Sequence, residues 1–237
     1  VCSSDLVRGF AGDLGQKLTL ANLVSATIDA FDRIDILVNA HRMVQPCDPM
    51  TVGEDLLSDM LRENMISGLR LSQMVAKRMV AQAEDSDRDA LQNGAIVNVS
   101  SLAANWPNPK MLAYSISSAA QAQATRSLAA ALAPKRIRVN GVAFASIMSN
   151  ILQQKLREDA SLRDRMIAAT PLGRIAGADE LAATVTVRNA LHWSEYLTKW
   201  LVGMVANAMN DLGCQNHVCL VLTGEQGKFK PTWLDNL

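Results

Sequence analysis

The stretch Gly94-Ala-Ile-Val-Asn-Val-Ser-Ser101 is an apolar run, interrupted only by Asn98, that ends in two serines. A nearly continuous apolar run of this length predicts a strand buried on both faces of a parallel sheet. Tyr114 follows thirteen residues after Ser101 and stands near the start of an alanine-rich segment, 112–133. That segment predicts a helix, and Pro134 is expected to end it. The centre of the chain therefore predicts a buried strand, a connection and a helix.

Strand and helix patterns alternate on both sides of this stretch. Short apolar runs predict further strands, at 34–38, 137–142 and 218–222, with a short strand end at 7–11. Apolar residues at helical spacing predict helices, at 18–31, 51–82, 147–169 and from 178 onward. Strands separated by helices predict an α/β fold, with a doubly wound parallel sheet and helices on both faces.

Composition narrows the classes of protein to consider. A chain of 237 residues is long enough for one domain with a sizeable core. The 23 basic and 23 acidic residues cancel, so nothing points to nucleic acid or an acidic membrane as a partner. No apolar run approaches the roughly 18 residues that span a bilayer. The four cysteines are too few and scattered for a disulfide framework, which favours the cytoplasm.

One short motif contains residue types that can bind a metal ion. Cys214-x-x-His217-x-Cys219 carries three potential zinc ligands, but no second ligand pair stands at the usual spacing. We therefore expect ordinary thiols there and no metal.

The spacing of Ser101 and Tyr114 resembles the short-chain dehydrogenase/reductase family, whose signature is a serine followed by Tyr-x-x-x-Lys. The resemblance runs from about Phe10 to about Thr184, in the family's order. It implies a Rossmann-like sheet, a bound NAD or NADP, and hydride transfer between nicotinamide and a carbonyl or alcohol substrate, as in 3-oxoacyl reductases. Taken singly, Ser101 could be a cap and Tyr114 a core residue; their joint spacing favours the catalytic positions.

The resemblance implies a role for each catalytic residue. Tyr114 would be the general acid in reduction and the base in oxidation. Ser101 would hydrogen-bond the substrate oxygen, and Asn64 would hold a relay water, unless Asn64 lies on a solvated helix face. The lysine position holds Ser118.

The missing lysine has a predictable cost. A neighbouring cation lowers the pKa of an acid by about 1–3 units, so its loss predicts a rate roughly ten- to a thousand-fold lower in the step that needs phenolate. Lys110 and Arg42 are candidate replacement cations, and nothing in the sequence fixes either near Tyr114.

The resemblance also implies cofactor-binding positions. Asp13 matches an aspartate that contacts the adenine ring; it could also be an acid that stabilises a helix N-terminus, and the two roles are compatible. Asn39 matches an asparagine that steadies the sheet under the adenosine, and Ala40 stands where a second asparagine is usual. Ser149 falls where a threonine often bonds the carboxamide.

Three departures affect the same cofactor. Arg42 replaces a glycine that would permit close backbone approach, and Phe144-Ala145 replaces a Pro-Gly pair. The glycine-rich loop that would place a pyrophosphate on a helix N-terminus is absent from the sequence, and the first strands of the fold are expected to be missing with it. We therefore expect weak binding of NAD or NADP.

The expected organisation follows from these matches. Residues 1–184 form a truncated Rossmann domain, in which 1–6 are expected to be non-native. Residues 185–237 form a divergent C-terminal segment of helix and strand in the same domain.

Three functions remain open at this point: an impaired reductase, a catalytically inactive relative that acts by binding or dimerisation, and a gene fragment without function. The resemblance implies a homo-oligomer built on the helices at 51–82 and 112–133. Small alanine side chains on the second helix favour close helix contact, and two exposed apolar helices would be unusual on a monomer.

Overall fold

The structure is a computed structural model, and it describes residues 8–50, 55–85, 92–106, 108–148, 150–177, 180 and 220–222. The chain divides into two compact units. The first unit contains residues 1–143 and 216–223, and the second contains 144–215 and 224–237.

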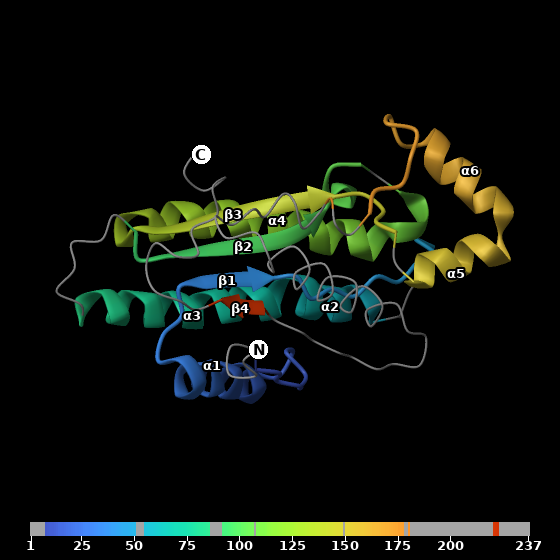
Figure 1. The fold of residues 1–237 in the computed structure, drawn as a ribbon. Helices are drawn as coiled ribbons and strands as arrows, with labels where there is room; N and C mark the ends of the chain where they lie inside the picture. The colour runs from blue at the N-terminus through green and yellow to red at the C-terminus, as the bar shows by residue number, and fades with distance from the viewer. Residues whose placement is uncertain are drawn as a thin grey trace, which may run out of the picture. The chain divides into compact units, whose positions relative to one another are not determined.

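The first unit is built on a four-stranded sheet with the order β3-β2-β1-β4. Its strands are β1 (Ile36–Asn39), β2 (Gly94–Ser101), β3 (Ile137–Phe144) and β4 (Leu220–Leu222). Figure 1 shows β1, β2 and β3 pointing the same way. β1 and β2 pair in parallel, with Asn39 opposite Asn98, whereas β4 pairs antiparallel with β1. Every residue of β1 and all but the first of β2 are buried, as the apolar runs predicted.

Helices of this unit cover one face of the sheet. α4 (Leu112–Leu132) lies behind β3 and β2 in Figure 1, α3 (Ser67–Glu84) lies behind β1 and β4, and α1 (Lys17–Phe31) lies below α3. Buried apolar side chains from these helices and from β1, β2 and β3 form one core: Leu20, Leu23, Leu37, Leu71, Val75, Met79, Ile96, Leu128, Ile137 and Val139. Each such side chain, when fully buried, stabilises the fold by about 1.5–3 kcal/mol. This core fixes the strand ends that the candidate site uses.

The long helix expected at 51–82 has a defect in its middle. α2 (Leu56–Leu61) continues into a π-helical turn, η2 (Arg62–Ile66), and then into α3. A π-helical turn widens the helix by one residue and re-aims the side chains that it carries. Glu63 and Asn64 on this turn are both buried.

The second unit contains α5 (Asn150–Glu158) and α6 (Ala160–Ala168), together with a bridge between Ile147 and Ala176. The single helix expected at 147–169 is therefore wrong at its start and its centre. Asp159 has an extended backbone, and its carboxylate accepts hydrogen bonds from the N–H groups of Ser161 and Leu162. An aspartate in this position caps the following helix, so α6 begins anew after Asp159.

The other sequence predictions have mixed outcomes. The strands at 34–38, 94–101 and 137–142 and the helices at 18–31 and 112–133 are confirmed to within two residues at their ends. The strand end at 7–11 is wrong for residues 8–11, which form no strand. Ser149, the Cys214–Cys219 motif and most of the helix after 178 lie outside the described residues. Among the helices that the structure describes, none combines the length and apolar character that crossing a membrane requires.

Candidate active site

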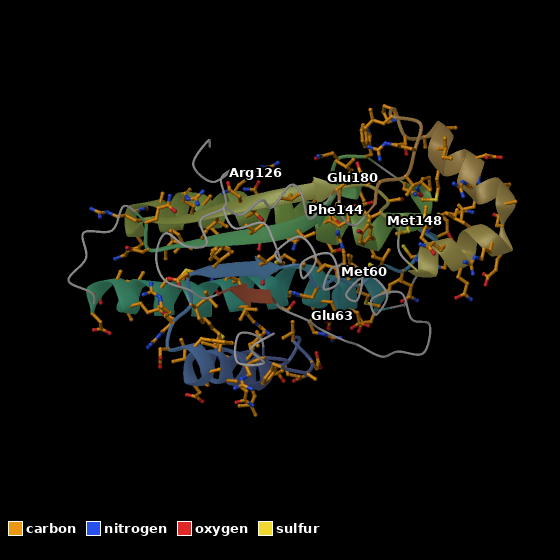
Figure 2. The ribbon with its side chains drawn as sticks, viewed as in Figure 1. Met60, Glu63, Arg126, Phe144, Met148 and Glu180 are labelled. Atoms are coloured by element: carbon orange, nitrogen blue, oxygen red, sulfur yellow. The ribbon has the colours of Figure 1, made fainter. Side chains whose placement is uncertain are left out.

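Tyr114 lies in the first turn of α4, beside the carboxyl end of β2. Its side chain is buried and packs in a cluster with Met60 of α2 and with Ala113; Met60 is labelled in Figure 2. Ala103, two residues after Ser101, packs against the same cluster. The structure thus brings the segments of the predicted catalytic pair together.

Ser101 is buried and closes β2. Its hydroxyl oxygen accepts a hydrogen bond from the N–H of Ala103 at 3.2 Å, which caps the short 3₁₀-helix η3 (Leu102–Ala104). A serine hydroxyl can donate a hydrogen bond while it accepts another, so this cap is compatible with binding a substrate oxygen.

Asn64 is held in the π-helical turn by three hydrogen bonds. Its Oδ1 accepts from the N–H of Met43 at 2.6 Å, and its Nδ2 donates to the carbonyl of Met43 at 2.9 Å. Nδ2 also donates to Oγ of Ser117 at 3.0 Å, and Oγ of Ser117 donates to the carbonyl of Tyr114 at 3.0 Å. Asn64 is only 1% exposed, so the alternative of a solvated helix face is wrong. It joins the segment after β1 to the turn that carries Tyr114.

Arg42 reaches Tyr114 from the segment after β1. Its guanidinium carbon lies 4.9 Å from the centroid of the Tyr114 ring, within the usual range of a cation–π contact. One guanidinium nitrogen donates to the carbonyl of Ser100 at 3.0 Å, and another lies 3.4 Å from Oγ of Ser118. Of the two candidate cations, Arg42 is therefore the one at Tyr114; Lys110 is exposed.

The charge of Arg42 is set by two opposing effects. Burial lowers the pKa of Arg42 from its ordinary value, and the nearby Tyr114 offsets part of this decrease. A guanidinium is not deprotonated in proteins near neutral pH, so Arg42 stays a cation there.

Asn39 ties the end of β1 to its neighbours. Its Nδ2 donates to Oγ of Ser72 on α3 at 2.9 Å and to Oδ1 of Asn98 on β2 at 2.8 Å. Asn98 in turn donates to Oγ1 of Thr125 on α4 at 2.9 Å. This buried network fixes the strand ends to both helices, and Ala40 follows directly with no exposed surface.

Asp13 lies just before α1 and uses its carboxylate locally. Oδ1 accepts from the N–H of Gly15 at 2.8 Å, and Oδ2 accepts from the side-chain amide of Gln16 at 3.3 Å. This geometry is that of an acid at a helix start, one of the two roles expected for it.

Sequence reasoning missed Ser117 and left the position of Arg42 open. Ser117 is three residues after Tyr114 on one helix, so helical spacing alone could have identified it. Arg42 is 76 residues before Ser118, and no spacing rule covers that separation.

Comparison with protein families gives two matches. The model described as "Enoyl-(Acyl carrier protein) reductase" matches residues 2–189. The model described as "Virulence-associated protein E-like domain" matches residues 177–237. The first covers more than half of the chain, and the second falls on the segment for which the sequence offered no match.

The curated relatives are dehydrogenases and reductases by name. The chain is 29% identical over 202 residues to "Glucose and ribitol dehydrogenase homolog 2" of Arabidopsis thaliana, covering 84% of this chain and 65% of that relative. It is 29% identical to "3-oxoacyl-[acyl-carrier-protein] reductase FabG" of Thermotoga maritima, covering 78% and 70%. It is 31% identical to "Short-chain reductase protein NovJ" of Streptomyces niveus, covering 81% and 70%. The chain thus spans about two thirds of these relatives' lengths.

Solved structures share the fold. A gluconate 5-dehydrogenase from Burkholderia cenocepacia, in complex with NADP and tartrate, aligns with a TM-score of 0.64 at 24% identity, covering 73% of this chain and 64% of that one. The structure "ElxO with NADP Bound" aligns with a TM-score of 0.65 at 20% identity, covering 76% and 71%. Together with the sequence matches, the parallel sheet and its flanking helices establish that the chain belongs to the short-chain dehydrogenase/reductase family, with a Rossmann-like fold.

Proposed function

We propose that this chain is an oxidoreductase that transfers hydride between a nicotinamide cofactor and a carbonyl or alcohol substrate. One observation carries the proposal: Tyr114 is held where β1 and β2 end, with a guanidinium over its ring. A phenol in contact with a buried cation is suited to giving up and taking back a proton.

The proposed roles divide among three side chains. In reduction the Tyr114 hydroxyl gives its proton to the carbonyl oxygen, and in oxidation the phenolate takes that proton back. The Ser101 hydroxyl donates a hydrogen bond to the same oxygen and orients it. Asn64, fixed by Met43 and Ser117, holds a water that returns protons to the site.

The edge of the sheet fits a nicotinamide dinucleotide in part. Ligands of doubly wound sheets bind outside the carboxyl ends of the strands, where the Arg42 guanidinium supplies donors for ribose or phosphate oxygens. NAD or NADP would supply or accept the hydride. Two solved relatives carry NADP by their titles.

Binding is expected to be weak, because Arg42 fills space that a glycine would leave open. Asn39 and Asp13 engage other protein groups, so we propose that they act by shaping the cofactor site. Ala40 and Ser149 are proposed to line it.

For the substrate, we propose a 3-oxoacyl thioester as the first compound to test. One curated relative is a 3-oxoacyl reductase by name, and the matching family model describes an acyl-carrier-protein reductase. Sugars and polyols follow, since other relatives carry such names.

A homo-oligomer in the cytoplasm is proposed as the working form. Leu112 and Ile116 on α4 and Leu57 on α2 are exposed apolar side chains. Covering them against a second copy would remove apolar surface from water. Light scattering coupled to size exclusion tests the assembly: a monomer at all concentrations would contradict it.

The activity test uses the purified 237-residue chain with NADH or NADPH, 3-oxoacyl thioesters and a panel of aldehydes and ketones. Tyr114→Phe is expected to lower turnover about 10²–10⁴-fold, since it removes the proton donor. Tyr196→Phe, the matched change at the only other tyrosine, should leave turnover unchanged. Equal rates for Tyr114→Phe and the parent would contradict the proposal. Absence of turnover in every assay, with a stable oligomer, would favour the inactive binding relative.

A further inference from the structure

Three contacts define the position of the Arg42 guanidinium. It lies over the ring of Tyr114, donates to the carbonyl of Ser100 at the end of β2, and comes within 3.4 Å of the Ser118 hydroxyl. Ser100 and Ser118 are both buried. A planar guanidinium can stack on a ring and donate at its edge at the same time, which an ammonium group cannot do.

Position 118 faces the same space from the helix side. Residues four apart on a helix share a face, so Ser118 lies one turn beyond Tyr114 on the same side of α4. Ser118 has no exposed surface, and its hydroxyl is shorter than any basic side chain. The Arg42 guanidinium therefore occupies the space into which a longer basic side chain at position 118 would extend.

We infer that Arg42 supplies, from the segment after β1, the cation that position 118 lacks, and that it acts as a positioning residue for Tyr114. The inference rests on the proposed function for its kinetic consequence, and on geometry alone for the shared cation position.

The physical basis is electrostatic. Negative charge develops on the Tyr114 oxygen as the hydroxyl loses its proton. A buried cation stabilises that charge more strongly than a solvated one, because little water screens the pair.

The kinetic arm compares four variants of the full chain. Arg42→Gln is expected to lower kcat at least about tenfold with a smaller change in KM, because the lost interaction forms mainly in the transition state. Arg42→Lys should recover part of the rate by keeping the charge. Arg42→Gln with Ser118→Lys should recover it as well, with the cation now supplied from α4. Ser118→Lys alone should bring no gain, because the position is already filled.

The stability arm needs no turnover. With Arg42 present, Ser118→Lys is expected to lower Tm by about 4 °C or more, because two cations then compete for one buried position. In the Arg42→Gln background the same change should lower Tm by clearly less. Arg126→Gln, on an exposed arginine of α4 labelled in Figure 2, is the matched control for loss of an arginine and should alter neither rate nor Tm.

The kinetic and stability experiments together distinguish a failure of the inference about Arg42 from a failure of the proposed function. An active parent with an equally active Arg42→Gln variant would overturn the inference and leave the proposed function standing. Equal Tm losses for Ser118→Lys in both backgrounds would overturn the shared cation position. The parent chain could show no turnover while Ser118→Lys still lowers Tm more in the parent than in the Arg42→Gln background. That result would support the position of Arg42 and refute the proposed function.

Discussion

The two units of the chain place hydrogen-bonded polar side chains in opposite surroundings. In the first unit, Asn39, Asn98 and Thr125 form a hydrogen-bonded row with almost no exposed surface. In the second unit, Arg174 and Glu180 pair at 2.5 Å with both side chains largely exposed. Water competes for the second set and not for the first. The comparison teaches that burial, more than bond length, decides how much each contact matters to this fold.

The largest expected effect is in the apolar core of the first unit. Leu71→Ala removes a fully buried side chain between α3 and the sheet, and should lower the free energy of unfolding by about 2–5 kcal/mol. Denaturant unfolding measures it. Leu18→Ala, on a side chain 72% exposed, is the matched control and should stay within about 0.5 kcal/mol. Similar losses for the two would show that the first unit lacks the dense core described.

The second largest loss of unfolding free energy is expected in the buried row of Asn39, Asn98 and Thr125. Asn98→Ala leaves the amide of Asn39 and the hydroxyl of Thr125 each short of a buried partner, and should cost about 2–3 kcal/mol. The same unfolding experiment applies, with Asn105→Ala at an exposed position as control. A loss below that of the control would mean that water satisfies this row.

The third largest loss is expected from one hydrogen bond beside the candidate site, between Asn64 and Ser117. Ser117→Ala removes one hydrogen bond from Asn64 and should cost about 1 kcal/mol, because Asn64 keeps its two bonds to Met43. Ser127→Ala, on the exposed face of α4, is the control. If Ser117→Ala lost more unfolding free energy than Asn98→Ala, a single hydrogen bond would matter more than the buried network, contrary to this ranking.

The smallest effect is in the exposed pair. Hydrogen bonding to Arg174 lowers the pKa of Glu180 from 4.5 to about 2. A lowered pKa means that the pair stabilises the fold above pH 4.5 and that this contribution is lost as the pH falls through about 2. Carboxyl NMR titration of Arg174→Gln should show the Glu180 midpoint move up toward 4.5, with no measurable change in Tm at pH 7.

Lys155→Gln serves as the control for that titration, because Lys155 is an exposed cation of α5 and lies outside the Arg174–Glu180 pair. A clear drop in Tm for Arg174→Gln at neutral pH would contradict the view that exposure makes this pair weak.

Local patterns predicted much of the first unit. The run from Gly94 to Ser101 became a strand because its residues can be buried on both faces, and 112–133 became a helix because alanine favours one. The break at Asp159 was missed, although an aspartate before Ala-Ser-Leu is an N-cap signal that the sequence carries. The π-helical turn at Arg62–Ile66 has no comparable local signal, since it depends on what the helix packs against.

The sequence by itself determined the family, the buried strands and the presence of Ser101, Tyr114 and Ser118 at family spacing, because those features depend on residue type and on separations within one element or one connection. Only the tertiary structure decided which cation meets Tyr114. Arg42 and Ser118 are 76 residues apart, and their approach depends on the parallel register of β1 with β2 and on the packing of α4 beside them. Side chains that meet through such long-range packing are set by the whole core at once, and no local pattern encodes their distance.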